Sequence, residues 1–211
     1  MPDTAPPTWD TRYAGEALLF GEAPNRFLAA QSARLKHGWS ALAVADGEGR
    51  NGVWLAEQGL AVLSIDASAV AQAKARRLAA SRRVDLQFEL ADLETWSFPQ
   101  AAFDVVAGIF IQFANPSLRA RLFRAMQRAL KPGGLILLEG YRPEQLAYGT
   151  GGPRIVENLY TEAMLRDAFA EFEILQLNAY DAVIEEGAGH RGMSALIDLV
   201  ARAPSQDQMQ G

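Results

Sequence analysis

Short apolar runs alternate with stretches of helical spacing along most of this chain. The runs predict strands at 41–45, 61–65, 86–90, 103–109 and 135–138. Around them, apolar residues recur every three or four positions, which predicts helices at 24–37, 51–58, 68–81, 116–130 and 161–170. Strands that alternate with helices in this way predict an α/β fold with a parallel, doubly wound sheet and helices on both faces.

Residues at the predicted helix boundaries support these assignments. Ser68, Asn115 and Thr161 each precede a helical stretch, and their side chains can accept hydrogen bonds from the first free backbone N–H groups. Pro116 stands at the first helical position, which proline favours, and the sequence KPGG at 131–134 ends the same helix.

The last two predicted strands, at 173–183 and 194–201, are separated by the sequence EEGAGHRG rather than by a helix. A connection this short requires the two strands to be antiparallel. The whole pattern predicts a mostly parallel, seven-stranded, Rossmann-like sheet that ends in an antiparallel hairpin. We expect a single domain over 9–203, with flexible tails at 1–8 and 204–211.

Composition narrows the functions that such a fold can carry. The 211 residues are 49% hydrophobic and 21% charged, with a net charge of −5, two histidines and no cysteine. The lack of cysteine excludes a disulfide framework, a thiolate zinc site and a cysteine nucleophile, and we expect no metal site. The acidic balance argues against a nucleic-acid surface, and the sequence has neither a long apolar run nor a secretory signal. We therefore expect a soluble, cytoplasmic protein that acts on a small molecule.

The turn after the first strand contains glycines in a cofactor-binding pattern. Gly47, Gly49 and Gly52 match GxGxxG between a predicted strand and a predicted helix. Asp66 follows the second strand, 19 residues after Gly47, where an acid that binds a ribose is expected. Ligands of open α/β sheets bind beyond the carboxyl ends of the strands, so this arrangement predicts a nucleotide-type cofactor.

Charges within the glycine turn discriminate between cofactors. Asp46 and Glu48 would repel the pyrophosphate of a dinucleotide, which needs bare amides and the positive end of a helix dipole. The two acids suit S-adenosylmethionine, which carries an ammonium and a sulfonium group. An NAD-dependent oxidoreductase remains the alternative, because the glycine pattern itself fits NAD. Both acids also fit an ordinary solvated loop.

Carboxylates after the second and third strands are the candidates for binding the nucleoside. Asp66 can accept hydrogen bonds from both ribose hydroxyls, and a helix cap for the segment after Ser68 is the alternative. Asp92 can bind the adenine amino group, with Leu93 beside the ring, and a loop acid facing water is the simpler alternative.

With these residues identified, the chain resembles the class I S-adenosylmethionine-dependent methyltransferases, and among them the TehB-like and thiopurine methyltransferase-like branch. The resemblance extends from Trp9 to Ala201. It rests on the sequences DGEGRN, SIDAS, ADLETW, FDVVAGIF, LKPGGLILLEGY and EEGAGHRGMSA. The resemblance implies methyl transfer by in-line displacement to a small-molecule thiol, oxyanion or amine, a reaction that depends mainly on positioning.

The resemblance also implies cofactor-binding residues. The glycine turn would contact the methionine part, Asp66 the ribose and Asp92 the adenine. The segment after the fourth strand would line the cofactor, and the N-terminal segment would cover it. The implied set is Trp9, Tyr13, Asp46, Gly47, Glu48, Gly49, Asp66, Ala67, Asp92, Leu93, Gly108, Ile109 and Phe110.

The chain departs from the family pattern within the glycine turn. The family has an acid and a glycine at the positions that Ala43 and Ala45 occupy here. The usual anchor for the cofactor's amine is therefore missing. Either Asp46 replaces it or the cofactor binds more weakly, and a non-catalytic protein that retains the fold is a further alternative.

Candidates for the acceptor side lie in the C-terminal half. The predicted topology places His190 on the cofactor side, where it can act as a base or as a hydrogen-bond donor. Arg142 can bind an oxyanion or a carboxylate, and Tyr141 begins a glycine-rich loop that can close as a lid. An exposed histidine, a surface arginine and an ordinary loop at the rim are the respective alternatives.

Overall fold

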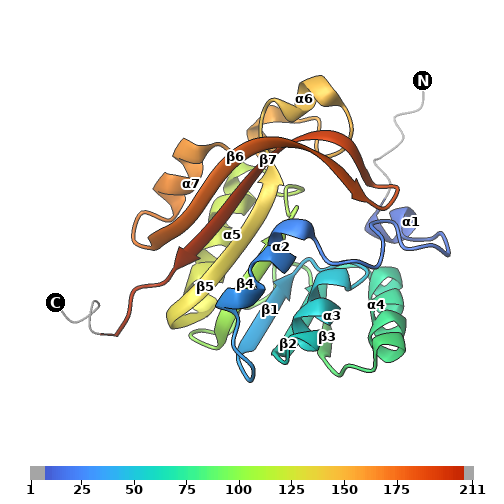
Figure 1. Cartoon of the computed structure of the whole chain (residues 1–211), viewed down its shortest axis with the longest axis horizontal. Coiled ribbons are helices and arrows are strands. Elements are labelled where there is room, and N and C mark those ends of the chain that lie inside the picture. The colour runs from blue at the N-terminus through green and yellow to red at the C-terminus, as the bar shows by residue number, and fades with distance from the viewer. Residues whose placement is uncertain (1–7, 207–211) are drawn as a thin grey trace.

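The computed structural model describes residues 8–206, so most of both predicted tails, at 1–7 and 207–211, lies outside the described residues. A seven-stranded sheet in the order β3-β2-β1-β4-β5-β7-β6 forms the centre of the molecule (Figure 1). Its strands are β1 (Ser40–Val44), β2 (Ala61–Asp66), β3 (Gln87–Leu90), β4 (Phe103–Ile109), β5 (Leu130–Tyr141), β6 (Glu173–Glu186) and β7 (His190–Arg202). The strands β1 to β5 are parallel, whereas β7 runs antiparallel to both β5 and β6. The predicted fold class is confirmed.

Helices cover both faces of this sheet. They are α1 (Trp9–Arg12), α2 (Arg26–Ala30), α3 (Arg50–Glu57), α4 (Ala69–Arg82), α5 (Pro116–Ala129), α6 (Gln145–Tyr148) and α7 (Glu162–Ala168), with 3-10 turns at Ser32–Arg34 and Val156–Asn158. Successive residues of a strand point to opposite faces, so each face builds its own core. On β5, Ile136 and Leu138 pack with α5 and α7, whereas Leu137 packs with α2 and α3.

The predicted helix caps are present. The side chain of Ser68 accepts a hydrogen bond from the Ala71 N–H at 3.0 Å, at the start of α4. Asn115 does the same for α5, and Thr161 for α7. Each cap satisfies a backbone donor that has no partner within its helix, which fixes where the helix begins.

The helix predicted at 24–37 is shorter than expected. It begins at Arg26 rather than at Pro24, because Asn25 caps it by accepting a hydrogen bond from the Leu28 N–H at 3.0 Å. After Ala30 the chain tightens into a 3-10 turn. Asn25 is thereby buried at the N-terminal end of α2.

The C-terminal hairpin is longer than predicted and its turn is much shorter. Glu185 and Glu186 belong to β6, and His190 and Arg191 belong to β7, where Glu186 pairs with His190. The sequence EEGAGHRG was expected to form the turn, but Glu186 is buried and forms an ion pair with Arg50. The hairpin therefore continues past the edge of the sheet and arches toward α1 (Figure 1).

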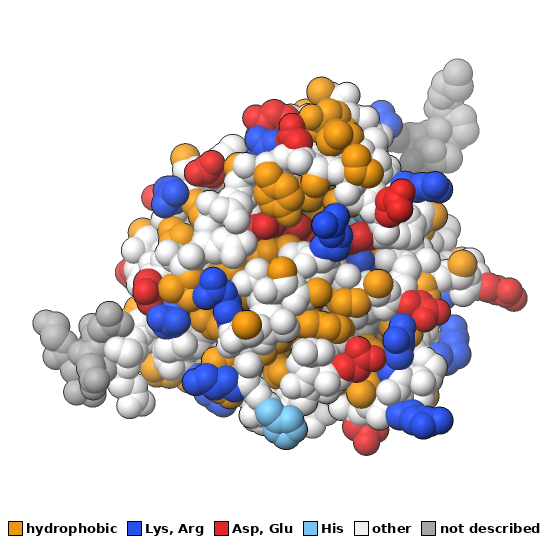
Figure 2. Space-filling view, viewed as in Figure 1, with side chains coloured by type: hydrophobic (Ala, Val, Ile, Leu, Met, Phe, Trp, Pro, Cys, Tyr) orange, Lys and Arg blue, Asp and Glu red, His pale blue; other side chains and the backbone are white. Residues whose placement is uncertain are grey.

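The surface in Figure 2 carries Lys and Arg side chains interspersed with Asp and Glu. Apolar side chains gather over α6, at the top of that view. None of the helices within 8–206 combines the length and the apolar composition needed to span a bilayer.

Candidate functional site

A cavity of about 500 Å³ opens at the carboxyl ends of β1, β2 and β4, under α1 and the tip of the β6–β7 hairpin. This is the edge at which open α/β sheets bind ligands, and the volume is within the usual range for a small-molecule site. Its lining includes the predicted residues Trp9, Tyr13, Asp46, Gly47, Asp66, Ala67, Asp92, Leu93, Ile109, Phe110, Tyr141 and His190. The topology therefore brings together most of the residues singled out in the sequence.

Asp66 and Gly47 form the centre of the glycine turn. The Gly47 N–H donates a hydrogen bond to Asp66 Oδ2 at 2.8 Å, and the Ser68 N–H donates to Oδ1 at 2.7 Å. Each carboxylate oxygen keeps a further acceptor site, so Asp66 can still bind hydroxyl groups in the cavity. Burial raises the pKa of Asp66, an effect that these two hydrogen bonds oppose.

The other glycines of the turn serve packing rather than cofactor contact. A Cβ atom on Gly49 would lie 2.6 Å from the Ala75 Cβ, so this glycine permits the close approach of α3 to α4. A Cβ atom on Gly52 would collide with the Asp46 carboxylate. Gly49 is absent from the cavity lining, where the resemblance had placed it.

Asp46 is a buried acid beneath the cavity. Its carboxylate accepts hydrogen bonds from Ser64 Oγ at 2.7 Å and from the Gly52 N–H at 3.1 Å. Burial raises the pKa of Asp46 to about 7, so the side chain is partly protonated at neutral pH. Ala43, where the family has its acid, is buried within β1.

Glu48 lies elsewhere than the sequence suggested. It was predicted at the cofactor, but its carboxylate is absent from the cavity lining and forms a buried ion pair with Lys74 of α4 at 2.7 Å. The Leu19 N–H donates to the same carboxylate at 2.6 Å, and Lys74 Nζ donates to the Ala17 carbonyl at 2.9 Å. Glu48 and Lys74 thus hold the N-terminal segment in place.

That N-terminal segment, residues 9–21, covers the cavity. Trp9 and Tyr13 stack with ring centroids 5.8 Å apart. The Tyr13 side chain lies over the glycine turn, and its hydroxyl oxygen is 2.7 Å from where a Gly47 Cβ atom would stand. Asp10 accepts a hydrogen bond from Ser68 Oγ at 2.5 Å, which ties α1 to the start of α4. The expected cover over the glycine turn is present in the structure.

Residues after β3 and β4 complete the cofactor side. Asp92 is exposed to the cavity and accepts a hydrogen bond from the Glu94 N–H at 2.9 Å, while Leu93 is buried beside it. Ile109 and Phe110 line the cavity at the end of β4. Gly108 does not, because it is enclosed by core side chains within the strand, which corrects its predicted placement.

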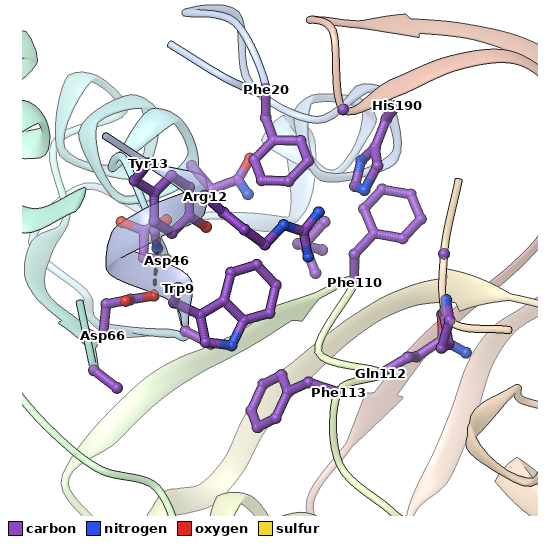
Figure 3. A pocket seen from close by; sticks show the side chains of 18 of the residues that line it. Trp9, Arg12, Tyr13, Phe20, Asp46, Asp66, Phe110, Gln112, Phe113 and His190 are labelled. Carbon is purple, nitrogen blue, oxygen red and sulfur yellow. Dashed lines mark hydrogen bonds between the residues drawn. The ribbon is translucent and has the colours of Figure 1, made fainter. Parts of the chain in front are cut away.

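His190 lies at the start of β7 and faces the cavity between two aromatic rings. Its ring centroid is 4.4 Å from those of Phe20 and Phe110 (Figure 3). Its Nδ1 atom is 4.0 Å from Glu186 Oε2 and has no hydrogen-bond partner among the described residues. Burial lowers the pKa of His190, which leaves the imidazole neutral at pH 7 and able to accept a proton.

Glu186 is held in its charged form behind His190. It pairs with Arg50 at 2.6 Å, and both side chains are buried. Burial opposes ionisation, but the contacts with His190 and Arg50 outweigh it and lower the pKa of Glu186 to about 2.

The two predicted acceptor-side residues of β5 and its following loop differ in placement. Tyr141 lines the cavity, although its hydroxyl is buried and has no hydrogen-bond partner within 8–206. Arg142 is not part of the lining, because Asp181 and Glu144 hold its guanidinium outside the cavity. The predicted role of Arg142 in binding an anion is therefore not supported by its position.

Several other lining residues were not among the predicted site residues. They are Arg12, Phe20, Ala45, Arg50, Asn51, Glu94, Gln112, Phe113, Gly151, Gly152, Pro153 and Gly189. Of these, Arg12 was within reach of prediction, because it stands three residues after Trp9 and therefore on the same face of a helical turn. The others lie in loops or, like Arg50 and Asn51, at the start of α3, and their approach to the cavity depends on tertiary packing.

The residues present fit S-adenosylmethionine. Asp46, Asp66 and Asp92 gather carboxylates at one side of the cavity, which favours a cationic ligand. Acceptor sites remain free on the Asp66 carboxylate, which lines the same cavity. The sheet order also differs from the all-parallel 3-2-1-4-5-6 order of dinucleotide-binding folds, because the antiparallel β7 stands beside β5.

Comparisons with known proteins agree with this geometry. Residues 41–134 match a family described as a methyltransferase domain. No curated protein matches the sequence.

Solved structures share the fold. One is a protein of echinomycin biosynthesis concerned with converting a disulfide bond into a thioacetal group, with a TM-score of 0.75, 22% identity and coverage of 94% of this chain and 91% of that chain. TehB from Haemophilus influenzae has a TM-score of 0.69 and 16% identity, over 92% of this chain and 65% of its own. A S-adenosylmethionine-dependent methyltransferase from Methanosarcina mazei has a TM-score of 0.65 and 18% identity, over 87% of this chain and 100% of its own.

These likenesses show the fold. Residues 41–134 therefore match a methyltransferase domain, and the chain as a whole has the fold of these solved structures.

Proposed function

We propose that the protein is an S-adenosylmethionine-dependent methyltransferase that acts on a small-molecule thiol, oxyanion or amine, and that this acceptor binds between Phe20, Phe110 and His190. The proposal rests on one observation, which is that the cavity has an acidic side and an aromatic side. Carboxylates cluster at the ends of β1 to β3, whereas aromatic rings and His190 stand on the opposite side (Figure 3). One side suits the cationic cofactor, and the other suits an acceptor held against it.

On the cofactor side, we assign Asp66 to the ribose hydroxyls and Asp92 with Leu93 to the adenine. Gly47 and Asp46 face the methionine part, and Trp9 and Tyr13 cover the site and exclude water. When bound, S-adenosylmethionine supplies an electrophilic methyl group on a sulfonium centre. Holding the acceptor in line with that group at about 3–3.5 Å provides much of the acceleration in such displacements.

On the acceptor side, His190 is the residue suited to take a proton. Its neutral imidazole can accept the proton that a hydroxyl or ammonium acceptor loses, and Glu186 behind it stabilises the charge that results. An acceptor that is already a thiolate or an oxyanion needs no base. For those acceptors the walls of Phe20 and Phe110 would act by positioning and by excluding water.

The assignment of the acids is tested by calorimetric titration of S-adenosylhomocysteine. Asp66→Asn removes a charged acceptor and is expected to weaken binding about tenfold or more, since a hydrogen bond to a charged group contributes roughly 1.5–3 kcal/mol. Asp104→Asn is the matched control, because Asp104 pairs with Lys131 at the opposite end of β4. Unchanged affinity in Asp66→Asn would overturn the ribose assignment, and unchanged affinity in Asp46→Asn would show that Asp46 does not replace the missing anchor.

A further inference from the structure

We propose that Arg12 binds an anionic group of the methyl acceptor, so that the acceptor is an organic anion with an aromatic or otherwise apolar body. This inference rests on the proposed function of the cavity. Arg12 would thus bind the anion that the sequence predicted Arg142 to bind.

Arg12 is the cavity cation that lacks a counterion within 8–206. Its guanidinium lies 4.5 Å from the centroid of the Trp9 ring, and no described residue forms a hydrogen bond or an ion pair with it. The other arginine of the lining, Arg50, is neutralised by Glu186 at 2.6 Å. A planar guanidinium held on an aromatic face keeps its N–H groups free at the edge, where they can bind a carboxylate in bidentate fashion.

Arg12 points toward the acceptor side of the cavity. Figure 3 shows its guanidinium directed toward Phe110 and His190, away from Asp66. Its charge also contributes to lowering the pKa of His190, which agrees with this proximity. The carboxylates at the ends of β1 to β3 would repel an anion from the cofactor side. Arg12 therefore creates a region of opposite charge where the nucleophile has to bind.

The walls of this region indicate the rest of the acceptor. Trp9, Phe20, Phe110 and Phe113 line the same cavity with aromatic surface, and the Trp9 ring lies against the guanidinium. A small inorganic oxyanion would satisfy the charge but would leave these rings uncovered. An aromatic or apolar body covers them and gains the usual free energy of burying apolar surface.

The competing role for Arg12 is binding of the carboxylate of the cofactor's methionine part. Binding measurements separate the two roles. Protein saturated with S-adenosylhomocysteine is titrated calorimetrically with benzoate and 3-phenylpropionate, and with the neutral amides of the same two acids. The titrations are repeated with Arg12→Met, with Arg12→Lys and with the control Arg142→Met, whose side chain lies outside the cavity.

We expect at least one of the acids to bind wild type about tenfold more tightly than its amide. Arg12→Met should abolish that difference while leaving the affinity for S-adenosylhomocysteine within about twofold of wild type. Arg12→Lys should retain part of the preference because it keeps the charge without the planar fork. Arg142→Met should behave as wild type.

Two outcomes overturn the inference. One is equal affinity for acids and amides, or binding of neither, in wild type that binds S-adenosylhomocysteine. The other is a tenfold loss of S-adenosylhomocysteine affinity in Arg12→Met, which would assign Arg12 to the cofactor. Failure of wild type to bind S-adenosylhomocysteine at all would instead contradict the proposed cofactor site, so the two failures are distinguishable.

Discussion

Two residues at the mouth of the cavity adopt a backbone conformation that is costly for them. Ala45 has φ +50° and Phe110 has φ +56°, and they follow the adjacent parallel strands β1 and β4. Left-handed geometry costs a residue with a Cβ atom roughly 1–2 kcal/mol. Ala45 occupies the position where the family has a glycine, so this chain keeps the backbone path of the motif without the residue that adopts it freely.

Replacing Ala45 with glycine is expected to stabilise the protein. Glycine adopts the left-handed conformation without strain, which stabilises the folded state. It also gives the unfolded chain more conformational entropy, which offsets part of this gain. The net result is an increase of about 0.5–1 kcal/mol in the free energy of unfolding. Urea unfolding measures it. Arg83→Gly is the matched control, because Arg83 has φ +58° at the C-terminal cap of α4, away from the cavity. A loss of stability in Ala45→Gly alone would contradict the strain at this position.

The position of a site residue could be predicted from the sequence where the sheet topology alone determines it. Asp66 and Asp92 follow the parallel strands β2 and β3, so their placement at the cavity depends only on a parallel sheet, which the sequence pattern predicts. The direction of Glu48 depends on Lys74, 26 residues later on α4, and no local sequence pattern indicates that partnership. Arg142 was misplaced for the same reason, since Asp181 lies on β6.

At the scale of elements, the ion pair between Glu48 and Lys74 holds the N-terminal cover. It joins the glycine turn to α4 and binds the backbone of residues 17–19. A buried pair is costly to break because the remaining charge stays in a poorly solvated site. The cover over the cavity thus depends on two side chains that never contact the ligand.

Lys74→Met is therefore expected to lower the free energy of unfolding by about 3–5 kcal/mol. It should also release residues 9–21, which limited proteolysis followed by mass spectrometry detects. The double variant Lys74→Met with Glu48→Gln removes the unpaired charge and should recover at least half of the lost stability. A single variant as stable as wild type would refute this role of the ion pair.

At the scale of the whole molecule, the order of strands and helices follows from the sequence because hydrophobic periodicity is local. The lengths of β5, β6 and β7 cannot be predicted in this way, because the ends of these strands are fixed by partners distant in the sequence. Glu139 and Asp198 stand directly opposite each other on β5 and β7, both buried. Tyr180 donates to these carboxyl groups, at 3.3 Å and 3.2 Å.

This carboxyl pair predicts a pH dependence of stability. Burial raises the pKa of Asp198 to about 6, and burial with the neighbouring acid raises that of Glu139. Both groups bind protons more tightly in the folded state. Their contribution to stability is therefore complete below the ordinary aspartate pKa of 3.8 and is lost as the pH rises through about 6 and beyond.

Asp198→Asn should consequently lose less stability than wild type between about pH 5 and pH 8, as measured by urea unfolding at each pH. Asp104→Asn is the control. The hydrogen bonds and charge of Lys131 lower the pKa of Asp104, so its contribution is present above 3.8 and is lost only on acidification. Equal changes in wild type and Asp198→Asn would contradict a proton-binding pair.

The two ends of the described chain close the cavity together. The Gly189 N–H at the tip of the hairpin donates to the Leu19 carbonyl at 3.0 Å, and a Cβ atom on Gly189 would collide with the Phe20 ring. During synthesis, the segment that matches the family model is made long before β7. The wall that bears His190 is therefore the last part of the cavity to be translated. The cavity is closed on that side only when β7 has joined the sheet.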